Sequence, residues 1–112
     1  TRRLKQVLQL VAERFGGALH IEEVAELCGY SKSHFMRWFR KMTGQSFVTY
    51  LNEQRLSASA SMLRSEDCTQ TILAIAGKCG FENLSYFNRM FKRRYGMTPR
   101  EYRGKILNTK NV

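Results

Sequence analysis

The feature that most constrains this chain is an internal repeat. Three small or aromatic residues recur at an offset of 51: Ala25 and Ala76, Gly29 and Gly80, Tyr30 and Phe81. After one inserted residue the offset becomes 52, and the matched pairs are Phe35 and Phe87, Phe39 and Phe91, Gly44 and Gly96, Ser46 and Thr98, and Tyr50 and Tyr102. Two copies with a helix between them cannot form a solenoid. The 112 residues are therefore expected to form two similar lobes.

Each copy has the pattern of two consecutive helices. In the first copy, Ile21, Val24, Ala25 and Cys28 have the i, i+3, i+4, i+7 spacing of a short amphipathic helix that ends at Gly29. Ser31 is expected to cap a second helix whose buried stripe is Phe35, Trp38, Phe39 and Met42. In the second copy, Thr71 is the expected cap of the short helix, and Leu84, Phe87 and Phe91 mark the inner face of the longer one. A short helix, a turn at a glycine and a basic-faced helix predict a helix-turn-helix motif.

The remaining segments are also predicted to be helical. Residues 2–15 form an amphipathic helix that covers the first lobe, and residues 47–64 form a long helix, free of Gly and Pro, that bridges the lobes. Thr98, Pro99 and Glu101 have the arrangement of a capping box at the start of a last helix, which is expected to end near residue 107. The predicted fold is all-α, with seven helices in four segments: a first lobe (1–46), a linker helix (47–64), a second lobe (65–107) and a frayed tail (108–112).

The charge of the chain favours a polyanionic partner. Nineteen basic residues against nine acidic ones give a net charge of +10 and a pI near 10.0. Nucleic acid is the preferred class of partner, ahead of an anionic membrane surface or a charge that only aids solubility. No apolar run approaches the ~18 residues that span a bilayer, so we expect a cytoplasmic protein without a membrane partner.

Metal, cofactor and catalytic sites are not expected. The cysteines, Cys28, Cys68 and Cys79, contain no CxxC pair, and Cys28 and Cys79 are interpreted as small buried apolar residues. His34 has only His20 as a histidine partner, so we predict no metal site and no cofactor. The pattern also lacks a nucleophile paired with a base, a glycine-rich phosphate loop and a cluster of catalytic carboxylates. We therefore do not expect an enzyme.

The second copy carries a specific family signature. Its residues are Gly80-Phe81, Ser85-Tyr86-Phe87, Arg89, Phe91-Lys92, Gly96, Thr98-Pro99 and Tyr102-Arg103. This pattern resembles that of the AraC/XylS family of bacterial transcription regulators, and the resemblance extends from about Leu19 to Arg103. It implies a seven-helix, homeodomain-like unit in which two helix-turn-helix motifs are joined by a long helix. Ser59 is a departure, because the family usually has alanine at this position.

The resemblance implies a bacterial regulator that binds double-stranded DNA. Activation is the expected output, although the sequence leaves repression open, and RNA polymerase is a candidate second partner. The chain has no initiator Met and is expected to be a segment of a longer protein whose effector and dimerisation domain lies elsewhere. The operator, the regulated genes and the inducer are not predicted.

The predicted reading helices span residues 31–43 and 83–95. A major groove about 12 Å wide admits such helices, and the forked donors of Arg and Asn match the edges of guanine and adenine. The candidate base-reading residues are Ser33, Met36 and Arg37 in the first helix and Ser85, Asn88 and Arg89 in the second. The candidate phosphate-binding residues are Lys32, His34, Arg40, Lys41, Lys92, Arg93, Arg94 and the backbone around Thr98. Two such helices, joined by a bridge of 18 residues that is ~27 Å long, would read successive segments of the groove.

Several alternatives remain open from the sequence. Met36 could touch a thymine methyl group or only shield its helix, and Asn83 is more readily an N-cap than a base reader. Glu22, Glu23 and Glu26 are explained by the helix dipole, with a contact for RNA polymerase as the alternative. The competing function is a basic helical module that binds an acidic protein. RNA binding is third, because the major groove of A-form RNA is too narrow for these helices.

Overall fold

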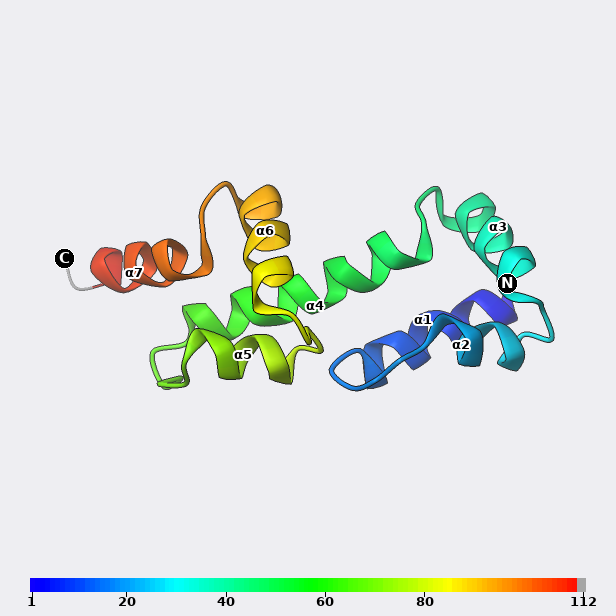
Figure 1. Cartoon of the computed structure of the whole chain (residues 1–112), viewed down its shortest axis with the longest axis horizontal. Coiled ribbons are helices and arrows are strands. Elements are labelled where there is room, and N and C mark those ends of the chain that lie inside the picture. The colour runs from blue at the N-terminus through cyan, green and yellow to red at the C-terminus, as the bar shows by residue number, and fades with distance from the viewer. Residues whose placement is uncertain (111–112) are drawn as a thin grey trace. The chain divides into compact units, whose positions relative to one another are not determined.

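The computed structural model describes residues 1–110, and the side chains of residues 1–106. Over that range the fold is all-α, as predicted (Figure 1). The helices in chain order are α1 (Arg2–Arg14), α2 (Ile21–Leu27), α3 (Lys32–Thr43), α4 (Phe47–Arg64), α5 (Ile72–Lys78), α6 (Leu84–Tyr95) and α7 (Pro99–Lys110). The chain divides within α4 into two compact units, Thr1–Gln54 and Arg55–Val112. The second unit is described through residue 110.

The first unit is built around aromatic rings from α3 and α4. Phe35 and Phe39 of α3 and Phe47 of α4 are almost completely buried, and the ring of Phe47 meets the other two edge-on at centroid distances of 5.2 and 5.3 Å. Val7 and Val11 bring α1 onto this core. The amphipathic first helix therefore covers the lobe as its pattern predicts.

The second unit repeats this construction. Phe87 and Phe91 of α6 are completely buried, and Tyr102 of α7 meets Phe91 at 5.3 Å, as Tyr50 of α4 meets Phe39 at 5.6 Å in the first unit. The apolar residues that α4 contributes to this core are Leu56, Ala60 and Leu63. The matched phenylalanines and tyrosines of the repeat therefore occupy corresponding places in the two cores.

Helix α4 has the predicted bounds, 47–64, and a side-chain cap at its start. The Ser46 hydroxyl accepts a hydrogen bond from the Thr49 N–H at 3.1 Å. Ser59, the departure from the family pattern, is completely buried, and its hydroxyl donates to the Leu56 carbonyl at 2.7 Å. This bond satisfies the buried hydroxyl within the helix. Serine therefore replaces alanine without leaving an unpaired polar group.

Two expectations about buried residues are corrected. Met42 is 38% exposed, because the buried stripe of α3 ends at Phe39, whose ring packs on Phe47. Leu84 is 36% exposed, because Phe81 from the preceding turn packs on Phe87 in its place, at 4.9 Å. Arg103 is half-buried, and its guanidinium donates to the carbonyl of Gln70 at 2.7 Å.

The C-terminal end of the chain also differs from the prediction. Helix α7 continues to Lys110, beyond the expected end near residue 107. Residues 108–110 contain no Gly or Pro that would stop it. Positions 108–110 of the predicted tail therefore belong to the helix, and residues 111–112 lie outside the described range.

Candidate nucleic-acid interface

The two helix-turn-helix motifs have matching backbone connections. In the turn of each motif, a backbone N–H donates a hydrogen bond to the carbonyl of the alanine in the short helix. Tyr30 donates to Ala25 at 3.0 Å, and Phe81 donates to Ala76 at 2.9 Å. Gly29 and Gly80 supply the positive φ angles of these turns, +73° and +96°. L-residues with a side chain disfavour this conformation. The glycines at matched positions therefore set the turn that directs each second helix.

The ends of α3 and α6 are fixed in the same way. At the start, the Ser31 hydroxyl accepts from the His34 N–H at 3.2 Å, and the Asn83 amide oxygen accepts from the Tyr86 N–H at 2.8 Å. At the end, Gly44 and Gly96 adopt left-handed conformations. Asn83 is thus the N-cap, the role that the sequence favoured for it. Capping by Ser31, Thr71 and Asn83 follows the predicted pattern.

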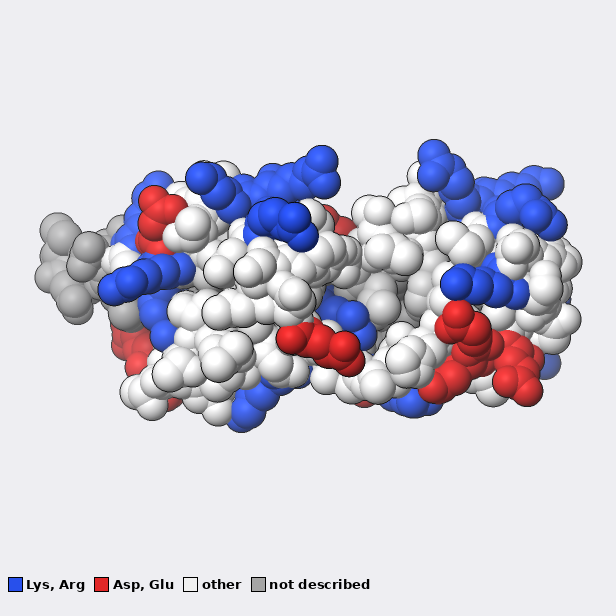
Figure 2. Space-filling view, viewed as in Figure 1, with Lys and Arg blue, Asp and Glu red and all other residues white. Residues whose placement is uncertain are grey.

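The exposed face of α3 carries most of the predicted contacts of the first motif. Arg37 lies two residues after the buried Phe35, and therefore about 200° around the helix from the core. Met36 beside it is 40% exposed. The other predicted residues of this helix are also exposed: Lys32, Ser33, His34, Arg40 and Lys41. Figure 2 shows lysine and arginine side chains gathered over α3.

The exposed face of α6 has the same layout. Arg89 lies two residues after the buried Phe87, and Ser85 is exposed on the same side. Asn88 is half-buried at the edge of this face. Lys92, Arg93 and Arg94 are all exposed in the last turn, and Figure 2 shows basic side chains over this helix too. Arg94 differs from the others, because it follows Phe87 by two helical turns and its guanidinium lies over the Tyr95 ring, 5.0 Å from the centroid.

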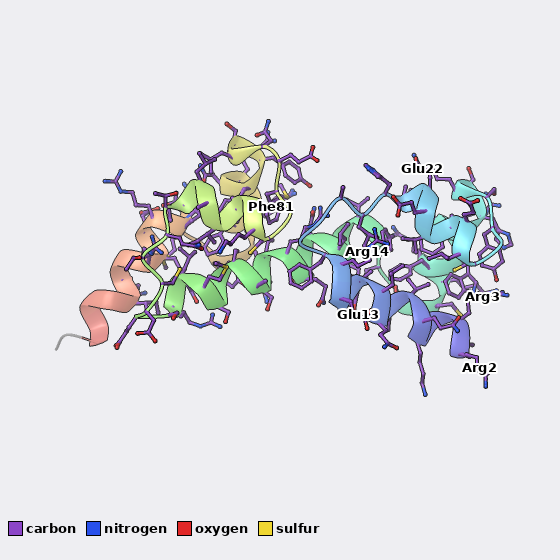
Figure 3. The ribbon with its side chains drawn as sticks, turned by 90° about the horizontal axis from the view of Figure 1, so that it is seen from below. Arg2, Arg3, Glu13, Arg14, Glu22 and Phe81 are labelled. Atoms are coloured by element: carbon purple, nitrogen blue, oxygen red, sulfur yellow. The ribbon has the colours of Figure 1, made fainter. Side chains whose placement is uncertain are left out.

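Aromatic side chains next to both helices hold residues of the candidate interface. In the first unit the Tyr30 ring stacks on His34 at 4.1 Å, and Arg3 of α1 (Figure 3) lies over Tyr30, 4.9 Å from its centroid, and donates a hydrogen bond to its hydroxyl. In the second unit the guanidinium of Arg89 lies 5.8 Å from the centroid of Tyr86. The sequence did not reveal the position of Arg3, because its partner is 27 residues away.

The acidic residues of α2 bind cations of their own unit. Glu22 pairs with Lys32 at 3.3 Å, and Glu23 pairs with Arg14 at 3.5 Å. A hydrogen bond from the backbone at the start of α2 and then the one from Lys32 lower the pKa of Glu22. This agrees with the interpretation through the helix dipole. It also means that Lys32, a predicted phosphate ligand, has a carboxylate partner in the structure.

The start of α7 is a complete capping box. The Thr98 N–H donates to the Glu101 carboxylate at 3.0 Å, and the Glu101 N–H donates to the Thr98 hydroxyl at 3.2 Å. The hydrogen bond from the Thr98 N–H, and then a hydrogen bond with the Thr98 side chain, lower the pKa of the Glu101 carboxyl. A phosphate would have to displace it. The phosphate-binding role of Thr98 stays a prediction, in which a phosphate replaces this carboxylate.

Arg103 connects α7 to the loop before α5. Besides Gln70, its guanidinium donates to the carbonyl of Cys68 at 3.3 Å. These bonds fix the loop that leads into the second motif. The thiols of Cys28 and Cys79 are buried, which raises their pKa values and agrees with their interpretation as small apolar residues.

Two kinds of feature are absent from the part of the chain that the structure describes. Within residues 1–110 no group of three or more His, Cys, Asp or Glu residues is placed to hold a metal ion. Over the same residues, every helix is too short or too polar to cross a lipid bilayer.

Comparison with known proteins shows that most of this chain is similar to helix-turn-helix proteins. Residues 24–105 match the family model of a helix-turn-helix domain. The Transposon Tn10 TetD protein of Escherichia coli is 36% identical over 103 residues, which cover 92% of this chain and 73% of TetD. The chain spans 37% and 35% of two longer curated regulators that it also matches.

Solved structures share the same fold. The DNA-binding domain of AdpA, a global transcriptional factor crystallised in complex with a target DNA, has a TM-score of 0.82 at 27% identity, over 91% of this chain and 90% of that one. A probable AraC family transcriptional regulator from Rhodopseudomonas palustris has a TM-score of 0.85 at 24% identity, over 95% of this chain and 98% of that one. With its matched residues, its two motifs and these relatives, the chain belongs to the AraC/XylS family of helix-turn-helix proteins.

Proposed function

We propose that this chain is the sequence-specific, double-stranded DNA-binding domain of a bacterial transcription regulator. The observation that carries the proposal is the pair of capped helices, α3 and α6, each with an arginine directly opposite its buried phenylalanines. The net charge of +10 favours a polyanion. The relation to the AdpA domain, which binds a target DNA, supports the same function.

The exposed residues of each helix fall into two proposed roles. Ser33, Met36, Arg37, Ser85, Asn88 and Arg89 read base edges in the major groove. Lys32, His34, Arg40, Lys41, Lys92, Arg93 and Arg94 contact phosphates, which position the protein without specifying sequence. Arg3 joins this second group, because it lies on the Tyr30 ring on which His34 stacks. Arg37 and Arg89 match guanine best, through bidentate donation to its O6 and N7 atoms.

The proposed site on DNA is bipartite. The continuous helix α4, with 18 residues, is ~27 Å long, close to the ~34 Å of one turn of B-DNA. We propose that it spaces the first lobe (1–46) and the second (65–107), so that their reading helices enter successive segments of the major groove.

Two further proposals concern the cell. We propose a cytoplasmic location, as is usual for a bacterial regulator that binds DNA. We also propose RNA polymerase as a second partner, through the acidic cluster of α2 (Glu22, Glu23 and Glu26) and the exposed C-terminal end of that helix. There Glu26 is exposed, and Leu27 after it is 71% exposed, so a protein partner would bury both charge and apolar surface.

The test is to select bound duplexes from a random pool and then to measure affinity over a range of salt concentrations. We expect strong preference for the selected duplex over a scrambled one. With roughly six phosphate contacts, log K should fall against log salt with a slope of about −5. Equal affinity for both duplexes would favour the basic interaction module, and a slope near zero would exclude nucleic acid as the partner.

A further inference from the structure

We infer that the two reading helices recognise half-sites of closely related sequence, which differ chiefly at the base pair contacted by Met36 in one and by Asn88 in the other. This inference rests on the proposed DNA-binding function and specifies it further. It identifies one matched pair of positions as the main source of difference between two otherwise equivalent readers.

Helices α3 and α6 are capped and docked in closely similar ways in their units. Each has 12 residues, begins after a side-chain cap and ends at a glycine in the left-handed conformation, with φ of +84° and +80°. Each is docked by a pair of phenylalanines at matched positions, 5.9 Å apart in α3 and 5.7 Å apart in α6. Because the caps, the end glycines and the buried phenylalanines coincide, residues 52 positions apart occupy corresponding places along the two helices.

Four matched pairs on the exposed faces carry the same or similar side chains: Ser33 and Ser85, Arg37 and Arg89, Arg40 and Lys92, and Lys41 and Arg93. Three other matched pairs differ, namely Lys32 and Leu84, His34 and Tyr86, and Met42 and Arg94, but none of these residues is proposed to read bases. Serine and arginine are identical in the two helices, and the two positions of the last turn keep their positive charge. Identical donors at corresponding places satisfy the same base edges, with a guanine under each arginine as the simplest case.

The two reading helices differ in chemistry at one matched pair of base-reading positions. Met36 and Asn88 both directly precede the arginine, at the fifth residue of their helices. An apolar side chain at this place favours the methyl group of thymine, whereas an asparagine amide matches the N6 and N7 atoms of adenine. The neighbouring residues His34 and Tyr86 are both aromatic. The half-sites should therefore share most base pairs and differ beneath this residue.

The experiment exchanges the two residues and selects duplexes again. The wild-type chain, Met36→Asn, Asn88→Met and the double exchange are each incubated with a random duplex pool, and the bound sequences are compared. The matched control is Met42→Asn, which makes the same chemical change in α3. Met42 is as exposed as Met36 but lies two turns after Phe35, on the core side of the helix. Thermal unfolding checks that each variant is folded.

We expect the wild-type site to contain one submotif twice, in either orientation, with one variable position. Met36→Asn should change the variable base pair of the first half-site to that of the second. Asn88→Met should change the variable base pair of the second half-site to that of the first. The double exchange should interchange the two base pairs. Discrimination at that base pair should change by about tenfold, and Met42→Asn should leave the selected sequence unaltered. Unrelated submotifs, or folded exchange variants with unchanged preferences, would overturn the inference. Failure of the wild-type chain to enrich any sequence would instead overturn the proposed function.

Discussion

At the scale of single residues, Arg37 and Arg89 are distinguished from Lys41 and Arg93 by their position along the helix. Arg37 and Arg89 lie opposite the buried phenylalanines near the middle of their helices, whereas Lys41 and Arg93 lie on the same face about one turn closer to the C-terminal ends. Arg89 also lies over the ring of Tyr86. This contact restricts the long side chain before DNA arrives, and such pre-organisation lowers the entropic cost of binding.

Alanine substitutions should separate the two roles of these cations. Arg37→Ala and Arg89→Ala should each cost about 1–3 kcal/mol on the selected duplex and relax discrimination only at the base pairs beneath that motif. Lys41→Ala and Arg93→Ala should weaken selected and scrambled duplexes alike and reduce the salt slope by about one unit. Each variant is titrated on matched and singly mismatched duplexes at two salt concentrations. Equal losses on every duplex for the arginine variants would show that they do not read bases.

At the scale of elements, the turns after α3 and α6 depend on glycine. Gly96 has φ of +80° and no atom within 4 Å of an added Cβ, so a substitution there meets backbone strain and no collision. Gly96→Ala should therefore lower the free energy of unfolding by about 1–2 kcal/mol. Gly77, inside α5, is the matched control, because its φ lies outside the positive region and its surroundings are also open. Gly77→Ala should stabilise by about 0.5–1 kcal/mol, and urea unfolding of both variants measures the difference. Equal effects of the two changes would exclude the conformational explanation.

The capping box of α7 should make stability depend on pH. The folded-state pKa of Glu101 is lowered by its bonds with Thr98, so its contribution is present above the unfolded pKa of about 4.3 and is lost as pH falls through the folded value. Glu101→Gln should therefore lower Tm at pH 7 and flatten its decrease between about pH 5 and pH 3. Melting curves of the variant and the wild type across this pH range measure the change in Tm. A constant difference in Tm between variant and wild type at every pH would contradict the assignment.

The same elements show what the sequence could and could not predict. The caps at Ser31, Thr71 and Asn83 and the four pairs of ring positions were predictable, because local hydrogen bonds and helical spacing determine them. The exposure of Met42 could not be predicted, since the core contacts of α3 involve Phe47 from the next helix. The Arg103 bonds span 33 and 35 residues, and the pairing of Lys32 with Glu22 depends on how α2 packs on α3. Contacts of this kind have no local pattern. The base-reading roles stay predictions.

At the scale of the whole molecule, the charge is divided unequally between the units. Residues 1–54 contain eight basic and five acidic residues, and residues 55–112 contain eleven and four. The exposed faces of α3 and α6 nevertheless match in charge at Arg37, Arg40 and Lys41 and their counterparts. The second unit therefore has the stronger general attraction to DNA, while the matched faces leave both units able to contribute specificity.

The proposed spacing by α4 predicts how the two units cooperate. Gln54 lies at the boundary between the units, within the unbroken helix. Gln54→Pro removes a backbone donor and disrupts the helix at a cost of about 3 kcal/mol, but each motif keeps its own core. A duplex with both half-sites should then be bound much less tightly, with footprints that no longer require a spacing of about 10 base pairs. The full site loses affinity because the broken linker no longer raises the effective concentration of the second unit. Binding to a single half-site should change little, because it uses only one motif.

Gln54→Ala is the control, since it removes the side chain and keeps the helix. Footprinting and titration on duplexes with half-site spacings of 8 to 14 base pairs, numbers chosen to cover about one turn of B-DNA, compare the two variants. The wild-type chain and Gln54→Ala should prefer one spacing sharply, and Gln54→Pro should show a broad, weak dependence. If Gln54→Pro keeps the sharp preference while circular dichroism shows loss of helix, the spacing is set by something other than α4. Loss of binding to single half-sites as well would show that the substitution unfolds a motif, because a broken linker alone leaves each reading helix on its own core.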